Sequence, residues 1–166
     1  MQEWTVLTLT QPHATLVVLG LKTIETRSWA TKHRGPLLIH AGLGPGYFGS
    51  EAALWQCCLS EPCRTALAKH GIRNPGRLPR GAIIGRVELD DCWPTADDGY
   101  VVTVDDGVMG FNIWPAVAAE ELAFGDYTSG RQAWLFSEPR QFATPIPARG
   151  RPGLWKWEGE IADVER

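Results

Sequence analysis

A short segment that follows Gly20 carries side chains able to recognise a nucleotide. It reads KTIETRSW from Lys22 to Trp29. If it forms a strand, alternation of the side chains places Thr23, Glu25, Arg27 and Trp29 on one face. An arginine presents a planar fork to a phosphate or a base edge, a glutamate accepts a hydrogen bond from an exocyclic amine, and an indole ring offers a stacking surface. The segment therefore predicts the wall of a binding site, with Lys22 at its entrance.

A solvated strand face is the alternative interpretation of the same segment. An exposed ion pair between Glu25 and Arg27 would then contribute under about 1 kcal/mol to stability. On an exposed site wall, replacing Lys22 or Arg27 with alanine would cost on the order of 0.5 kcal/mol of stability. Breaking a buried pair between Glu25 and Arg27 would instead cost about 3–5 kcal/mol. Measuring both the stability and the ligand affinity of such variants therefore distinguishes three cases: a binding site, a solvated strand face and a structural ion pair.

Other polar side chains are candidates for the edge of the same site. Tyr127, Ser129 and Arg131 lie in a polar turn before an apolar run, and such turns often form the rim of a site. The Arg149-Gly150-Arg151 sequence is equally consistent with a solvated turn and with a phosphate contact. The loop at 73–80 contains three arginines and forms a small basic cluster. Basic patches of this kind can bind nucleic acid on a chain whose overall charge is acidic.

Hydrolytic chemistry would depend on lysine, threonine and carboxylate groups in this chain. Neither a Ser-His-Asp order nor a His-Glu-x-x-His sequence is recognisable. Lys22 and Glu25 in one cleft could hydrolyse an amide, with the lysine or a threonine hydroxyl such as that of Thr23 as the nucleophile. The same groups could bind a modified base without altering it.

Three cysteines and a histidine are candidate zinc ligands. Cys57 and Cys58 are adjacent, Cys63 is near, and His70 follows. Neighbouring residues of a helix point about 100° apart, so an adjacent pair cannot easily bind one ion. Buried thiols on helices are the preferred interpretation, and we predict no metal and no cofactor.

Composition limits the class of protein. The chain has 166 residues, of which 44% are hydrophobic and 21% charged, with a net charge of −3. These values predict one folded domain over residues 1–166 and argue against a protein that coats DNA. No apolar run approaches the roughly 18–20 residues that span a bilayer, and no signal peptide is recognisable. We therefore expect a cytoplasmic protein with no membrane partner. Its protein partners are unknown.

The pattern of apolar residues predicts short strands with helices inserted between them. The expected strands are 4–10, 22–29, 36–41, 81–89, 133–136 and 153–157, and a hairpin is expected over 100–111. The expected helices begin near Pro12, Ser50, Pro62 and Trp114. His40 ends an apolar strand and is expected to be a hydrogen-bonded core histidine. The fold class predicted is α+β, with a small, strongly bent sheet or barrel.

Several separated stretches resemble the ASCH domain family. They are, in order, Gln11-Pro12, Gly20-x-Lys22-x-x-Glu25-x-Arg27-x-Trp29, Arg34-Gly35, Leu38-Ile39-His40-Ala41, Gly81-x-Ile83-x-Gly85, Phe124-Gly125, Gly130-Arg131-x-Ala133-Trp134, Pro145 to Gly150, and Leu154-Trp155. Their order and spacing cover about residues 7–157. The resemblance implies a PUA-like fold, which is a small bent β-barrel with helices packed around a cleft.

The resemblance also implies a function in nucleic-acid binding. ASCH domains are similar in fold to RNA-binding modules, so the expected partners are single-stranded RNA, DNA or a nucleoside. The alternating segment, the polar turn and the resemblance together give the predicted ligand-binding residues, which are Lys22, Glu25, Arg27, Trp29, Arg34, Tyr127, Ser129 and Arg131.

An enzymatic alternative comes from a bacterial branch of the family that hydrolyses acylated cytidine. That branch uses a lysine, a threonine three residues later and a distant glutamate. Lys22 matches the first position, Glu25 stands in place of the threonine with Thr23 nearby, and the distant acid falls near Glu121. A metal-assisted ribonuclease is a further alternative, because ribonuclease activity has been proposed for other members.

Overall fold

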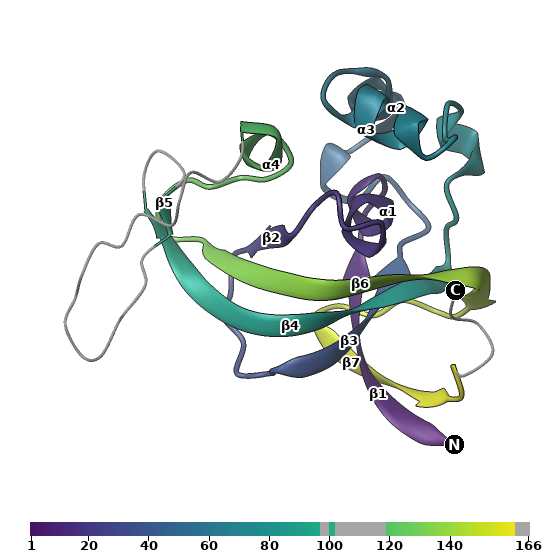
Figure 1. The fold of residues 1–166 in the computed structure, drawn as a ribbon, viewed down its shortest axis with the longest axis vertical. Helices are drawn as coiled ribbons and strands as arrows, with labels where there is room; N and C mark the ends of the chain where they lie inside the picture. The colour runs from purple at the N-terminus through teal and green to yellow at the C-terminus, as the bar shows by residue number, and fades with distance from the viewer. Residues whose placement is uncertain (97–99, 102–118, 162–166) are drawn as a thin grey trace.

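The computed structural model describes residues 1–96, 100–101 and 119–161, and it contains one curved sheet with helices packed against it (Figure 1). The strands are β1 (Gln2–Leu9), β2 (Ile24–Arg27), β3 (Gly35–Ala41), β4 (Ala82–Ala96), β5 (Tyr100–Val101), β6 (Gln132–Pro147) and β7 (Leu154–Gly159). The α-helices are α1 (His13–Val18), α2 (Glu51–Leu59), α3 (Cys63–Lys69) and α4 (Ala119–Ala123), and the short 3-10 turns are η1 (Gly46–Phe48) and η2 (Pro75–Arg77).

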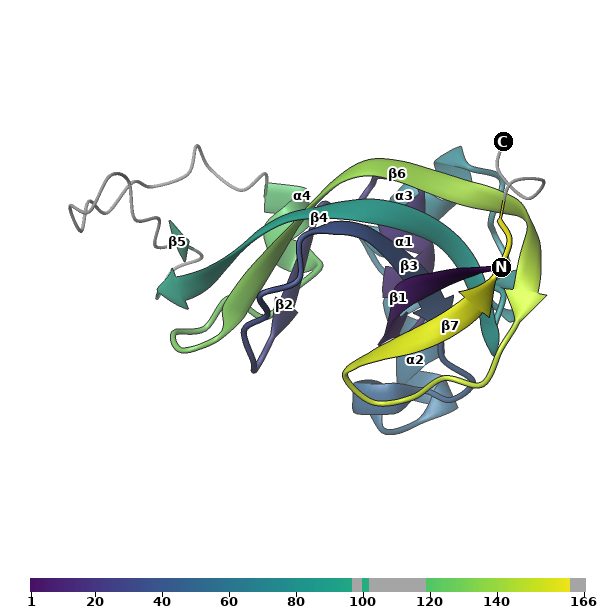
Figure 2. The ribbon, with the colours of Figure 1, turned by 90° about the horizontal axis from the view of Figure 1, so that it is seen from below.

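The strands form a sheet in the order β2-β6-β4-β3-β1-β7, and β5 pairs with the end of β4. Only the β1–β3 pairing is parallel among the described pairings. The predicted α+β class is confirmed, and the strands that contain Leu38, Ile83 and Trp134 belong to one sheet. A closed barrel is not confirmed, because β2 and β7, at the two ends of the order, do not pair with each other in the described part of the chain. Figure 2 shows the long strands β4 and β6 arching together over the molecule.

Irregular pairing bends the β4–β6 ladder. The register shifts between Ile83 and Gly85, and again further along the pair. A Cβ atom on Gly85 would lie 2.4 Å from the carbonyl oxygen of Arg140 and 2.6 Å from Cγ1 of Val18. Any larger side chain would therefore push β6 or α1 away. Glycine at this position lets α1 pack directly on the bend of the sheet.

Helix α1 is the centre of the core. All six of its residues are buried, because it packs on the sheet through Val17 and Val18 and on α2 and α3 through Leu16. Trp134 of β6 is fully buried in the cluster that includes Val17. The side of α1 that faces β2 is thereby held rigidly, and it forms one wall of the site described below.

Most of the predicted elements are confirmed, with longer strands than expected in β4 and β6. The Ser50 hydroxyl caps α2 by accepting a hydrogen bond from the Ala53 backbone N–H. Tyr100 and Val101, the first residues of the expected 100–111 hairpin, form the short strand β5, which pairs with Thr95 and Ala96 of β4. The rest of that hairpin, residues 102–111, and the expected helix start at Trp114 lie outside the described residues. No described helix combines the length and the apolarity needed to cross a membrane.

Candidate nucleic-acid interface

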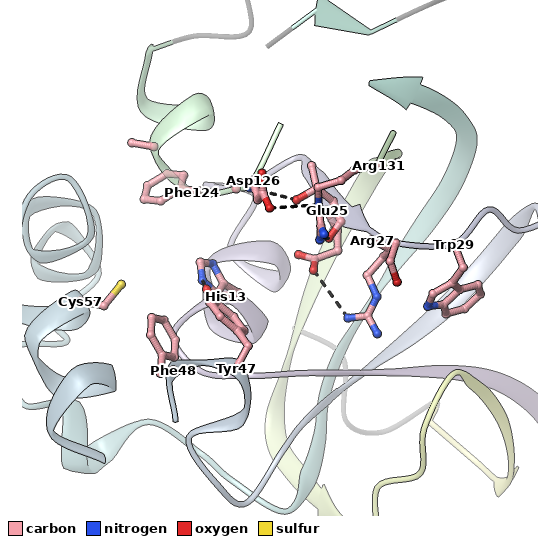
Figure 3. A pocket seen from close by; sticks show the side chains of 14 residues that line it. His13, Glu25, Arg27, Trp29, Tyr47, Phe48, Cys57, Phe124, Asp126 and Arg131 are labelled. Atoms are coloured by element: carbon pink, nitrogen blue, oxygen red, sulfur yellow. Dashed lines mark hydrogen bonds and ion pairs between the residues drawn. The ribbon is translucent and has the colours of Figure 1, made fainter. Parts of the chain in front are cut away.

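A cavity of about 650 Å³ opens between β2, the start of α1, η1 and the turn that follows α4 (Figure 3). We call it the β2 cavity. It is lined by His13, Glu25, Thr26, Arg27, Ser28, Trp29, Tyr47, Phe48, Cys57, Ala123, Phe124, Gly125, Asp126 and Arg131. Four of the predicted ligand-binding residues, Glu25, Arg27, Trp29 and Arg131, are therefore brought together.

The alternation in β2 explains how two of these side chains reach the cavity. Ile24 and Thr26 are buried, whereas Glu25 and Arg27 are partly exposed on the opposite face. Ile24 packs with Tyr127 and Ala133, so the strand cannot slip by one residue without burying its charges. The short strand thus presents an acid and a base side by side, as the sequence predicts, although it ends at Arg27 rather than at Trp29.

Lys22 lies beneath the cavity and not in its lining. Its side chain is 1% exposed, and Nζ donates hydrogen bonds to the carbonyl oxygens of Ile24 at 2.5 Å and Phe124 at 3.0 Å. The same Nζ is 3.7 Å from Oε2 of Glu25, whose Oε1 is 3.8 Å from Nη1 of Arg27. Glu25 therefore lies between a buried cation and a cation that faces the cavity.

Trp29 supports Arg27 and closes one end of the cavity. The guanidinium carbon of Arg27 is 5.9 Å from the centre of the Trp29 ring. Trp29 in turn meets the ring of Trp134 edge to face at 4.7 Å, and the Trp134 indole N–H donates to the Trp29 carbonyl oxygen at 3.2 Å. Since Trp134 is fully buried, Trp29 has a fixed support and its ring orientation is set before any ligand arrives.

Arg131 and Asp126 form a second charged pair at the rim. Nε of Arg131 is 3.5 Å from Oδ2 of Asp126, and its Nη2 donates to the Thr26 carbonyl oxygen at 3.1 Å. The hydroxyl and backbone N–H of Thr128 donate to Asp126, and together with nearby Arg131 they hold the pKa of that carboxyl below its usual range. The β2 cavity thus carries two arginines and two carboxylates.

An aromatic wall, which no sequence pattern predicted, faces these charges. His13 stacks on Tyr47 and on Phe48, with ring centres 5.8 and 5.9 Å apart, and its Nε2 is hydrogen-bonded to the Tyr47 hydroxyl. Tyr47 is 71% exposed. The Tyr47-Phe48 pair follows a glycine-proline-glycine sequence in the loop between β3 and α2. The presence of two adjacent aromatic residues in a glycine-rich loop was the one sequence feature that could have indicated this wall.

His13 should make folding stability sensitive to acid. Burial, with a smaller contribution from nearby Lys22, lowers its pKa from 6.5 to about 3. The unfolded chain therefore binds a proton between pH 6.5 and 3 that the folded chain does not, and stability present above pH 6.5 is lost as the pH falls. Between pH 7 and 4.5 we expect this residue to contribute a loss of about 2–3 kcal/mol.

Urea unfolding at the two pH values measures this effect. His13→Gln should remove the contribution, so its stability should fall less with acid than that of the parent protein. The exposed His70 provides a matched control, and His70→Gln should keep the parent's dependence. An equal loss in His13→Gln and the parent would refute the assignment.

Thr23 and Glu121, the other predicted catalytic residues, contact each other outside the cavity lining. The Glu121 carboxylate accepts hydrogen bonds from the backbone N–H groups of Thr23 at 2.9 Å and Ile24 at 3.0 Å, and from the Thr23 hydroxyl at 3.2 Å. This carboxylate joins α4 to the start of β2. Its hydrogen-bonding capacity is largely used by the fold.

Three predicted ligand-binding residues also lie outside the cavity lining. Arg34 forms an ion pair with Asp91 at 2.7 Å. Tyr127 is buried against Ile24, and burial raises the pKa of its hydroxyl. Ser129 is exposed in the turn before β6.

Of the four cysteines, only Cys57 lines the β2 cavity, and it lies in the same apolar cluster as Phe48, Cys58 and Cys63. Its Sγ is 3.7 Å from Sγ of Cys63, and the hydrogen bond between them lowers the pKa of Cys57 to about 7. Burial raises the pKa of Cys58 to about 11. Within the described ranges, His, Cys, Asp and Glu side chains form no group of three or more suited to a metal ion.

Comparison with known proteins gives one family. The model of the ASCH domain family matches residues 7–145. The chain is similar to activating signal cointegrator 1 from Mus musculus and from Homo sapiens, with 24% identity over 155 residues in each case, which is 93% of this chain and 22% of the relative. It thus spans about a fifth of the length of these curated relatives.

Two crystal structures of mutant forms of ZmASCH from Zymomonas mobilis are also similar. Both are 16% identical in sequence, with TM-scores of 0.39 and 0.40. The matches cover 86% and 87% of this chain and 72% and 76% of those chains.

Proposed function

Because this chain belongs to the ASCH domain family, a family associated with RNA binding, we propose that it binds single-stranded RNA through the β2 cavity. A base occupies the space between the aromatic wall of His13, Tyr47 and Phe48 and the charged row of Glu25 and Arg27. The observation that carries the proposal is this combination of ring surfaces with paired donors and acceptors in one cavity.

The size and chemistry of the cavity support a base as the ligand. A volume of about 650 Å³ is within the usual range of about 300–1,000 Å³ for small-ligand sites. Stacking on an aromatic ring contributes about 1–3 kcal/mol per base and requires a base that is free of its duplex partner. The exposed ring of Tyr47 is the accessible stacking surface.

The charged row supplies the groups that could read a base edge. The Glu25 carboxylate accepts hydrogen bonds from an exocyclic amine, as in cytosine or adenine, and the Arg27 guanidinium donates to ring nitrogen or carbonyl acceptors. Glu25 is 13% exposed, so its pairing with a base would occur away from bulk water. DNA and modified nucleosides share these edges, and they are the nearest alternatives as ligands.

The amidohydrolase alternative receives less support. Lys22 donates to two backbone carbonyl oxygens, and the Glu121 carboxylate accepts from Thr23 and Ile24. None of Lys22, Thr23 and Glu121 lines the β2 cavity in the described part of the chain. Glu25 is the one residue of the predicted catalytic set in the lining, and it stands where the acylcytidine-cleaving branch has threonine.

Titration of fluorescently labelled single-stranded RNA and of the matching duplex tests the proposal. At low salt the single strand should bind more tightly than the duplex, because only its bases are free to stack. Its affinity should fall as salt is raised, since phosphate contacts release counterions. Failure of the single strand to bind at low salt would refute the proposed function.

Incubation with acylcytidine and with RNA separates binding from catalysis. If the protein only binds, both compounds should be recovered intact. Turnover of acylcytidine in the presence of a chelator would favour the amidohydrolase, and RNA cleavage abolished by a chelator would favour the nuclease.

A further inference from the structure

A second cavity of about 470 Å³ lies beside the first, on the side of β1 and β3. We call it the arginine cavity. It is lined by Thr8, Arg27, His40, Gly42, Leu43, Arg149, Gly150, Arg151, Pro152 and Gly153. Arg27 lines both cavities, so a ligand that extends past this side chain passes from one cavity into the other.

The two cavities differ in charge. The described lining of the arginine cavity contains three arginines and no carboxylate, whereas two arginines and two carboxylates line the β2 cavity. Arg149 and Arg151 are exposed, and within the described residues neither makes an ion pair or hydrogen bond. Their guanidinium groups are therefore available for an anion. The balanced charges of the β2 cavity suit a neutral base, and the arginines of the second cavity suit a phosphate.

The segment that carries these arginines is fixed to the sheet. His40, itself buried, shares a hydrogen bond of 2.9 Å between its Nε2 and the Ala148 carbonyl oxygen, and the Ala148 backbone N–H donates to the Gly81 carbonyl oxygen at 3.1 Å. A Cβ atom on Gly150 would lie 2.6 Å from Cε1 of His40. Glycine is therefore required for the chain to cross this ring closely, with Arg149 and Arg151 on either side of the crossing.

We propose that Arg149 and Arg151, together with Arg27, bind the phosphate backbone of a single strand whose base lies in the β2 cavity. This proposal rests on the proposed function and specifies its ligand as a strand that continues past one nucleotide. Arg27 occupies the junction, where the base and the adjoining phosphate meet. Arg149 and Arg151 then hold the following phosphates.

A double substitution, Arg149→Ala with Arg151→Ala, tests this subsite. Its matched control is Arg64→Ala with Arg140→Ala, which removes the same charge from exposed residues that line neither cavity and lie outside the 73–80 basic cluster. The probes are a mixed-sequence RNA hexamer, the four ribonucleosides and their 5′-monophosphates. The subsite variant should bind the hexamer at least about tenfold more weakly at low salt, since charged hydrogen bonds are lost. The slope of log affinity against log salt should fall in magnitude by about 1.4 for two phosphates.

The other probes define the outcomes. Ribonucleosides should bind equally to the wild-type protein and the subsite variant, because they lack phosphate, and the control variant should bind the hexamer like the wild type. If the wild type binds the hexamer but the subsite variant keeps its affinity and salt slope, the subsite is refuted while the proposed function stands. If 5′-monophosphates lose as much affinity as the hexamer, the cavity takes a terminal phosphate and the strand proposal is wrong. A wild-type protein that binds none of the probes overturns both proposals.

Discussion

Replacing Lys22 with methionine is expected to lower the free energy of unfolding by about 3–5 kcal/mol, the usual consequence of removing one partner from a buried charged pair. Methionine keeps the length of the side chain and removes the ammonium group. The carbonyl oxygens of Ile24 and Phe124 then lose the lysine as a donor. Among the described residues, Arg27 at 3.8 Å is then the one ion-pair partner left to Glu25.

Chemical denaturation of the variant and a matched control measures this effect. Lys156 forms an ion pair with Glu3 at 3.1 Å, with both side chains more than half exposed. Lys156→Met should therefore cost under about 1 kcal/mol. A loss below about 1 kcal/mol for Lys22→Met would contradict the structural role given to Lys22. The sequence predicted only a small loss of stability on replacing Lys22, because it placed this side chain on an exposed wall. That prediction is wrong, because the Lys22 side chain is 1% exposed.

Replacing Glu121 with alanine is expected to cost about 2–4 kcal/mol of stability. The carboxylate accepts three hydrogen bonds from Thr23 and Ile24, and each hydrogen bond to a charged group contributes about 1.5–3 kcal/mol. The expected loss of stability is smaller than the sum over the three hydrogen bonds, because Thr23 is exposed and can form hydrogen bonds with water instead. The start of β2 would lose its attachment to α4, so RNA binding should weaken together with stability.

Glu61 provides the matched control for this change. Its carboxylate also accepts hydrogen bonds from a side chain and a backbone N–H, those of Arg64 and Thr65, but it is exposed. Glu61→Ala should cost less than about 1 kcal/mol in thermal or urea unfolding. Equal losses for the two variants would mean that Glu121 contributes no more than a surface carboxylate.

The part of the site that could be predicted from sequence is the part that local periodicity controls. Alternation along a short strand fixes which face Glu25 and Arg27 share, because Ile24 and Thr26 must be buried together. The position of Arg131 followed from a polar turn immediately before an apolar strand. In each case, neighbours in the sequence determine the direction of the side chain.

The remainder depends on contacts between distant segments. The buried Lys22 ammonium group donates a hydrogen bond to the carbonyl oxygen of Phe124, which is 102 residues away in the sequence. Tyr47 and Phe48 form a wall because His13 stacks on both, and no periodic pattern marks a pair of aromatic residues in a glycine-rich loop. Arg34 pairs with Asp91 of the neighbouring strand β4. Such contacts require the sheet order, which the apolar pattern alone does not specify.

The affinity of Arg27→Ala for single-stranded RNA tests the central claim most directly. Arg27 lines both cavities, is supported by Trp29 and is partly exposed, so its loss should remove ligand contacts and leave the melting temperature close to that of the parent. Arg64→Ala, which removes an exposed arginine paired with Glu61, controls for the change in net charge. We predict that Arg27→Ala binds single-stranded RNA about 10–100-fold more weakly, as expected for losing one or two charged hydrogen bonds, and that Arg64→Ala binds like the parent. Equal affinity of Arg27→Ala and the parent protein would contradict the claim that RNA is bound at the β2 cavity.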